Sequence, residues 1–127
     1  MKAALLVIFF ALPTLSNAAS FSCANAKSYA EKSVCADPLL SKLDEVLSTN
    51  YQRMLAANTG TSPGARKHEQ RKWQHERDRC SNQDCLIQAY ARRIDETCEY
   101  GVVEGVHPIC QGSDEVVPKD LLLKKVR

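Results

Sequence analysis

The sequence predicts an all-α protein, a small disulfide-stapled bundle of three to four helices with an irregular C-terminal tail. Three observations lead to this prediction. Apolar residues recur at three- and four-residue steps, residues that begin and end helices stand at the expected boundaries, and the 127 residues include six cysteines. A chain of this length fits one domain, and its modest core would gain stability from covalent cross-links.

The first 18 residues predict a secretory signal peptide. Lys2 supplies a short positive region, an apolar run follows over residues 3–12, and residues 16–18 have the small-x-small pattern of a cleavage site. The apolar run is shorter than the roughly 20 residues that span a bilayer. We therefore expect cleavage after Ala18, with cleavage after Ala19 as the alternative. The result would be an exported protein, periplasmic or secreted, with no membrane insertion after cleavage.

All six cysteines follow the expected cleavage site: Cys23, Cys35, Cys80, Cys85, Cys98 and Cys110. An even number in a small exported domain predicts three disulfides. A metal site fits less well, because no C-x-x-C occurs and the histidines do not complete a tetrahedral set. Local geometry favours Cys80–Cys85, which a helix–turn–helix corner would bring within reach of a bridge. Cys23–Cys35 and Cys98–Cys110 are also favoured, while crossed links such as Cys23–Cys80 stay open.

Capping residues and one apolar stripe predict the first two helices. Ser28 and Glu31 form a capping-box pair that begins a short helix ending near Cys35. Asp37 and Pro38 suit the start of a second helix of roughly 20 residues. Its apolar face consists of Leu39, Leu40, Leu43, Val46, Leu47, Tyr51, Met54 and Leu55. Its polar face includes Lys42, Asp44, Glu45, Ser48, Gln52 and Arg53.

The third helix is predicted to be strongly polar. Gly60 can end the second helix, and Ser62 followed by Pro63 can begin the third, which would end near Arg79. Trp73 is nearly its only apolar side chain of any size. Four of its residues share one face by their spacing: Gln70, Trp73, Arg77 and Cys80.

A fourth helix and an irregular tail complete the predicted fold. After a tight turn over residues 80–85, apolar residues lie on one side of this helix: Leu86, Ile87, Tyr90, Ile94 and Cys98. From Glu99 onward, glycine, proline and valine favour a loop or short hairpin over residues 102–108. Residues 120–125 would form a last short helix or a frayed end.

Short runs between about residues 20 and 97 keep a characteristic order and spacing. They are Ser20-Phe21-Ser22-Cys23, the run from Glu31 to Leu40, Leu43-Asp44, Tyr51, Glu69-Gln70-Arg71-Lys72-Trp73, Arg77-Asp78-Arg79-Cys80, Cys85-Leu86, Tyr90 and Arg93-Ile94. This pattern resembles the lysozyme inhibitor LprI N-terminal domain family, small exported helical domains that were long a domain of unknown function. The chain differs in lacking a lipobox and in adding a tail from Cys98 to Arg127.

The resemblance implies both an organisation and a function. It divides the chain into a signal peptide (1–18), an LprI-like helical domain (20–97) and a C-terminal tail (98–127) with an extra cysteine pair. The family's four cysteines would close among themselves, which leaves Cys98 and Cys110 for each other. The implied function is a small exported binding protein that inhibits lysozyme and so protects the cell wall. The alternative is an envelope interaction or immunity-like module that binds another protein without affecting lysozyme.

No pattern in the sequence predicts catalysis. There is no G-x-S-x-G motif, no phosphate-binding glycine loop and no H-E-x-x-H motif. His68 and His75 share a helix face but would lie roughly 10 Å apart, too far to chelate one ion. We therefore expect no enzyme, no catalytic or metal-binding residue and no cofactor.

Basic residues are concentrated on the third helix. The whole chain has 17 basic and 15 acidic residues, which gives no general reason to expect nucleic acid as a partner. Residues 61–80, however, carry six basic and three acidic side chains. This segment is either a solvated helix face or an anion-facing surface. The candidate partner-binding residues are Asn58, Thr61, Arg66, Lys67 and Lys72.

The family-motif residues Gln70, Arg71, Trp73, Arg77 and Asp78 have a structural and a binding interpretation. The structural one is favoured, because a helix this polar needs Trp73 for packing. Trp73 would then fill the centre of the bundle, while Arg77 and Asp78 would make polar contacts that join helices. The expected partner is a protein, either lysozyme or another envelope or toxin protein. The oligomeric state is left open.

Overall fold

The computed structural model describes residues 19–57, 62–100 and 109–124. In these ranges the protein is all-helical and contains no strand. The elements are η1 (Cys23–Asn25), α1 (Tyr29–Ala36), α2 (Pro38–Ala56), α3 (Pro63–Arg77), α4 (Gln83–Glu99), η2 (Ser113–Glu115) and α5 (Lys119–Leu122). The predicted signal peptide and the predicted loop or hairpin at 102–108 lie outside the described residues. The small disulfide-stapled helical bundle is confirmed.

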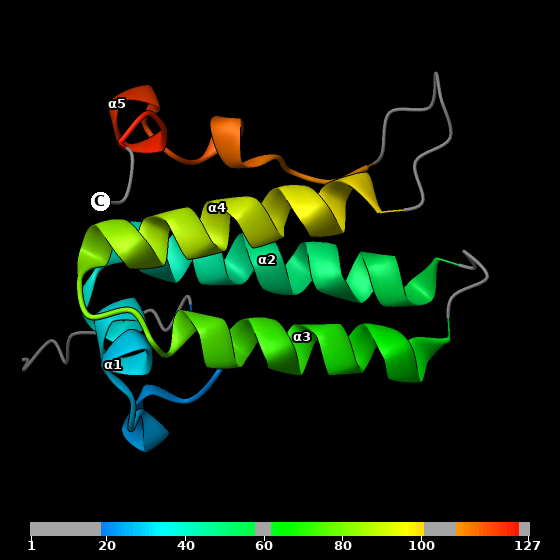
Figure 1. Cartoon of the computed structure of the whole chain (residues 1–127), viewed down its shortest axis with the longest axis horizontal. Coiled ribbons are helices and arrows are strands. Elements are labelled where there is room, and N and C mark those ends of the chain that lie inside the picture. Colours follow the sequence, from blue (N-terminus) through cyan, green and yellow to red (C-terminus); the bar gives the residue numbers. More distant parts are fainter. Residues whose placement is uncertain (1–18, 58–61, 101–108, 125–127) are drawn as a thin grey trace, which may run out of the picture.

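Three long helices form the body of the bundle. Figure 1 shows α2, α3 and α4 side by side, with α1 at one end and the tail along α4 on the side away from α3. α4 therefore packs against α2, α3 and the tail. In the described ranges no helix combines the length and the apolar character that crossing a membrane requires.

The predicted caps of α1 and α2 are both present. The Ser28 hydroxyl accepts a hydrogen bond from the Glu31 amide at 3.0 Å, and the Glu31 carboxylate accepts from the Ser28 amide at 3.1 Å. This reciprocal pair is the capping box. Asp37 caps α2 by accepting from the Leu40 amide at 2.9 Å, with Pro38 in the first turn. Local sequence alone thus determines where both helices begin.

The core lies between α2 and α4. The apolar stripe of α2 buries Leu40, Leu43, Val46, Leu47 and Met54, and α4 buries Leu86, Ile87, Tyr90 and Ile94. One prediction here is wrong: Asp44, assigned to the polar face of α2, is only 5% exposed. Asn50, six residues further along α2, is also buried. Both side chains have hydrogen-bond partners from other elements, which make their burial tolerable.

At the corner between α3 and α4, the first helix ends earlier than predicted and the second begins earlier than predicted. α3 ends at Arg77 rather than near Arg79. α4 begins at Gln83, inside the predicted turn, because the Asn82 side chain caps it by accepting from the Cys85 amide at 2.9 Å. Cys85 therefore lies in the first turn of α4.

All three favoured disulfides are present: Cys23–Cys35, Cys80–Cys85 and Cys98–Cys110, with Cα separations of 5.8, 5.5 and 5.4 Å. No cysteine is free. The first clips η1 to α1, the second closes the α3–α4 corner, and the third ties the tail to the end of α4. Bridges of this kind each stabilise a fold by about 2–4 kcal/mol. They also indicate an oxidising environment.

The tail is more ordered than predicted. Asp95 of α4 accepts from the amide and the hydroxyl of Ser113 at 2.8 and 2.7 Å, which fixes η2. Gln88 donates to the Leu121 carbonyl at 2.7 Å, and Val117 is 3% exposed. The predicted last helix is present as α5, but η2 was not predicted. The tail therefore adds to the core that α2 and α4 share.

Candidate functional site

Trp73 lies at the centre of the α3–α4 interface, as predicted. It is 5% exposed, and its indole N–H donates to the Ala89 carbonyl of α4 at 3.1 Å. Its ring meets the Tyr90 ring edge-on, with centroids 5.1 Å apart. A polar helix is thus held to the bundle by one large aromatic side chain with a satisfied donor.

A polar network extends from Trp73 across three helices. The Arg77 guanidinium lies over the Trp73 ring at 5.5 Å and donates to the Tyr90 hydroxyl at 3.3 Å. The Tyr90 hydroxyl in turn donates to the Asp44 carboxylate of α2 at 2.9 Å. Arg77 also donates to Asp78 at 2.9 and 2.7 Å. Arg77 therefore joins helices as predicted, whereas Asp78 contacts only its own neighbour through these bonds.

The environment fixes the protonation states in this network. Burial raises the pKa of the Tyr90 phenol well above its ordinary value, and the Asp44 carboxylate raises it further. Burial opposes the charge of Arg77, but the Tyr90 oxygen and the Asp78 carboxylate outweigh it and raise the pKa of the guanidinium. Tyr90 thus stays a neutral donor and Arg77 stays a cation. With these contacts the network joins α3, α4 and α2.

Gln70 completes the inward face of α3. Its amide oxygen accepts from Arg93 of α4 at 3.0 Å, and Arg93 also pairs with Glu96 at 3.1 Å. Arg93 is 6% exposed. The motif residues Gln70, Trp73 and Arg77 therefore share a packing role.

Arg66 corrects the predicted partner-binding set. It was expected at a partner-facing surface but is only 3% exposed. Its guanidinium donates to the carbonyls of Met54 and Ala57 at the end of α2 and lies 5.6 Å from the Tyr100 ring centroid. The side chain caps a helix end, since C-terminal carbonyls lack partners within their own helix. It is therefore not available to a partner.

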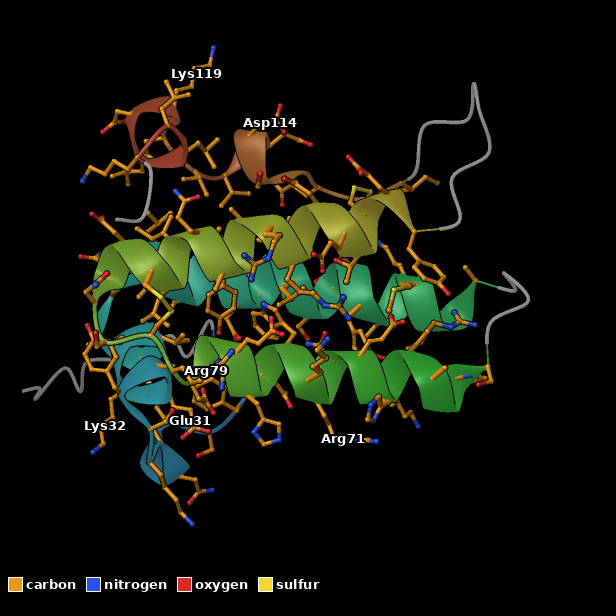
Figure 2. The ribbon with its side chains drawn as sticks, in the orientation of Figure 1. Glu31, Lys32, Arg71, Arg79, Asp114 and Lys119 are labelled. Atoms are coloured by element: carbon orange, nitrogen blue, oxygen red, sulfur yellow. A yellow bond between two sulfur atoms is a disulfide. The ribbon has the colours of Figure 1, made fainter. Side chains whose placement is uncertain are left out.

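The outward side of α3 carries a group of exposed basic residues. We call it the basic face: Lys67, His68, Arg71, Lys72, His75 and Arg79, all exposed. Lys67, Arg71 and His75 follow each other at four-residue steps along about 12 Å of α3, and Arg79 comes two residues after the helix ends. Figure 2 shows Arg71 pointing away from α4 and the tail. The sequence predicted Lys67 and Lys72 as binding candidates but excluded the two histidines only as a metal site.

The acidic residues of α3 lie toward α4 instead. Glu69 and Glu76 line a groove of about 470 Å³ between α3 and α4, together with Glu96 and Glu99. Glu76 lies 3.9 Å from Arg92 across this groove. The groove therefore mixes both signs of charge, and the positive charge of α3 is concentrated on its outward side. A hollow of about 470 Å³ follows the basic face from His68 to Arg79 and is also bordered by Glu76.

Two predicted binding residues, Asn58 and Thr61, lie outside the described residues. Among the residues the structure describes, no group of three or more His, Cys, Asp or Glu side chains is placed to hold a metal ion. His68 and His75 are both exposed. The described site is thus a charged surface on a rigid helix.

Comparison of the chain with protein-family models, with curated proteins and with solved structures finds no match in any of the three. The resemblance to the LprI N-terminal family therefore rests on the residues of this sequence and stays a prediction.

Proposed function

We propose that the protein is exported through its N-terminal signal peptide and acts by binding an acidic surface of another protein through the basic face of α3. The resemblance to the LprI family makes lysozyme the first partner to test, with inhibition as the outcome. The observation that carries the proposal is the separation of charge on α3. Its exposed basic side chains lie mainly on the outward side, while Glu69 and Glu76 line the groove against α4, which Lys72 also borders.

The scaffold suits a protein that works by binding. Trp73 and the Arg77–Tyr90–Asp44 network fix α3 against α2 and α4, and a disulfide closes the α3–α4 corner. The basic face is therefore held on a rigid helix before any partner arrives. Preorganisation of this kind reduces the ordering cost of binding and so favours affinity.

The chemistry of the basic face fits a cleft lined by carboxylates. Glycoside hydrolases such as lysozyme cleave their substrate between two carboxyl groups in a cleft. Exposed basic side chains on a convex helix could enter such a cleft and pair with both groups. Arg71 and Lys72, near the middle of the basic face, are the side chains that we assign to this contact.

The test is residual muramidase activity in the presence of purified protein with its disulfides formed. The variant is Arg71→Glu with Lys72→Glu. The matched control is Lys119→Glu with Lys42→Glu, which makes the same charge change at exposed sites on α5 and α2. Figure 2 shows Lys119 on the opposite side of the molecule from Arg71. We expect inhibition by the wild type and the control, and at least tenfold weaker inhibition by the α3 variant.

Two results would decide against this proposal. If the wild type does not inhibit several types of lysozyme at micromolar concentration, lysozyme is not the partner. The envelope-interaction alternative is then tested by capture from envelope extract, with the same two variants. If the α3 variant binds as well as the control does in either assay, the basic face is not the binding surface.

A further inference from the structure

Asp44 is a buried carboxylate without a direct countercharge among the described residues. It is 5% exposed and accepts hydrogen bonds from the Tyr90 hydroxyl at 2.9 Å and from the Ser20 backbone nitrogen at 2.6 Å. Arg77 shares the Tyr90 hydroxyl, but its guanidinium pairs with Asp78. Burying a carboxylate costs free energy unless a positive group or several donors compensate it.

The Ser20 backbone nitrogen is one of the two hydrogen-bond donors to Asp44. Ser20 itself is exposed, while Ala19 and Phe21 on either side of it pack against the core. The two flanking contacts hold the Ser20 nitrogen at the carboxylate. A hollow of about 320 Å³ adjoins this point and is lined by Ser20, Phe21, Asp44 and Arg77, among others. The position therefore has room for a group larger than a peptide N–H.

The expected signal-peptide cleavage occurs at this same place. Cleavage after Ala18 would leave the new amino group on Ala19, and cleavage after Ala19 would leave it on the Ser20 nitrogen. Hydrolysis of the peptide bond consumes one water, leaves a carboxylate on the signal peptide and leaves a protonated amine on the mature chain. An α-ammonium is ordinarily charged at neutral pH, because its pKa is about 7.7–8.0.

We propose that Asp44 is the docking site for the α-ammonium of the mature N-terminus, so that processing beside Ala19 supplies the countercharge that the buried carboxylate lacks. The inference rests on the export step of the proposed function and is independent of the partner. Since Ser20 is exposed, the ammonium keeps part of its hydration and pairs with Asp44 at a smaller desolvation cost than a fully buried ion would incur. Signal-peptide removal thus completes the fold.

The test is a thermodynamic cycle on purified, oxidised protein. One axis is the first residue: chains that begin at Ala19 or Ser20 against a chain that begins at Asn17. The other axis is Asp44→Asn, with Glu45→Gln as a matched control, since Glu45 is an exposed neighbour that undergoes the same charge change. The measurement is the melting temperature at pH 7. Export and lysozyme binding play no part in it, so failure of the proposed function would leave the result unchanged.

In the wild-type and Glu45→Gln backgrounds, we expect the chains that begin at Ala19 or Ser20 to melt at least about 4 °C above the chain that begins at Asn17. In Asp44→Asn the difference should fall to about 1 °C or less. The inference is overturned if the extension has no effect in the wild type, or if it lowers the melting temperature equally in Asp44→Asn.

A second measurement covers the case in which Asp44→Asn does not fold. Cys23 allows native chemical ligation of a synthetic peptide covering residues 19–22 to the rest of the mature chain. Two full mature chains are made this way, one with a free and one with an acetylated N-terminus. They differ in one charge and one small group. The free chain should melt about 4 °C higher, and equal melting temperatures would overturn the inference.

Discussion

The two sides of α3 carry similar residues with opposite roles. On the inward side, Arg66, Trp73 and Arg77 are at most 6% exposed and bond to α2 and α4. On the outward side, the basic face is exposed throughout. Charge alone therefore does not decide whether a side chain of this helix faces a partner. Helical position decides it, because the arginines on the inward side lie where carbonyls, a phenol or a carboxylate accept hydrogen bonds from their guanidinium groups.

Among substitutions on the inward side of α3, removal of the Trp73 side chain should destabilise the protein most. Trp73→Ala loses a large buried ring and the indole hydrogen bond to Ala89, and we expect the free energy of unfolding to fall by about 3–5 kcal/mol. The control is Gln74→Ala, at the next and exposed position, which should change it by less than about 0.5 kcal/mol. Urea unfolding with the disulfides intact measures both. Equal effects would contradict the assignment of Trp73 to the core.

The arginines at positions 77 and 79 provide the sharpest matched pair. Arg77→Ala removes the link between Asp78 and Tyr90, so we expect a loss of about 2–3 kcal/mol of unfolding free energy. Arg79→Ala removes an exposed cation of the basic face and should cost less than about 0.5 kcal/mol. Thermal and urea unfolding of the two variants side by side would test this. If Arg79→Ala loses as much unfolding free energy as Arg77→Ala, the inward and outward residues do not differ in their contribution to stability.

Arg66 and Lys67 offer a second pair, with a smaller difference. Arg66→Ala leaves the Met54 and Ala57 carbonyls at the end of α2 without these guanidinium bonds, and we expect a loss of about 1–2 kcal/mol. Lys67→Ala should leave the unfolding free energy nearly unchanged but should weaken partner binding. If instead Arg66→Ala weakens binding at unchanged stability, Arg66 belongs to the binding surface after all.

The smallest expected effect is at Glu31, away from α3. Hydrogen bonds from the Lys27 and Ser28 amides lower the pKa of its carboxylate. Since the folded pKa lies below the unfolded one, the stabilisation is complete above the unfolded value of about 4.3 and is lost as the pH falls through the folded pKa. Glu31→Gln should therefore flatten the acid end of the stability-against-pH curve. An unchanged slope below about pH 4.3 would argue against the capping box as its source.

Local sequence predicted the starts of α1, α2 and α3 and the apolar stripes, because caps and periodicity act over a few residues. It also favoured the three disulfides that the structure contains. It did not predict the burial of Asp44 and Asn50, because their partners are distant in the chain. Tyr90 is 46 positions from Asp44, and the Gln111 carbonyl is 61 positions from Asn50, to which it is bonded. Arg66 illustrates the same limit. Its polarity suggests exposure, and only the position of the α2 end explains its burial.

The candidate site was predicted in part. Lys67 and Lys72 were identified by charge, and both lie on the basic face. His68, Arg71, His75 and Arg79 share that face. The four-residue spacing of Arg71 and His75 from Lys67 was the pattern that could have revealed it. The same spacing argument would have removed Arg66 from the predicted partner-binding residues, because Arg66 shares the inward helix face with Gln70, Trp73 and Arg77.

Lysine reactivity toward an amine-acetylating reagent, with and without lysozyme, tests the binding role of α3 most directly. Four exposed lysines report on different sides of the protein: Lys67 and Lys72 on the basic face, Lys42 on α2 and Lys119 on α5. We predict that saturating lysozyme slows acetylation of Lys67 and Lys72 several-fold and leaves Lys42 and Lys119 unchanged. If lysozyme leaves the acetylation rate of all four lysines unchanged, or slows it at Lys42 or Lys119 instead, binding through α3 is contradicted.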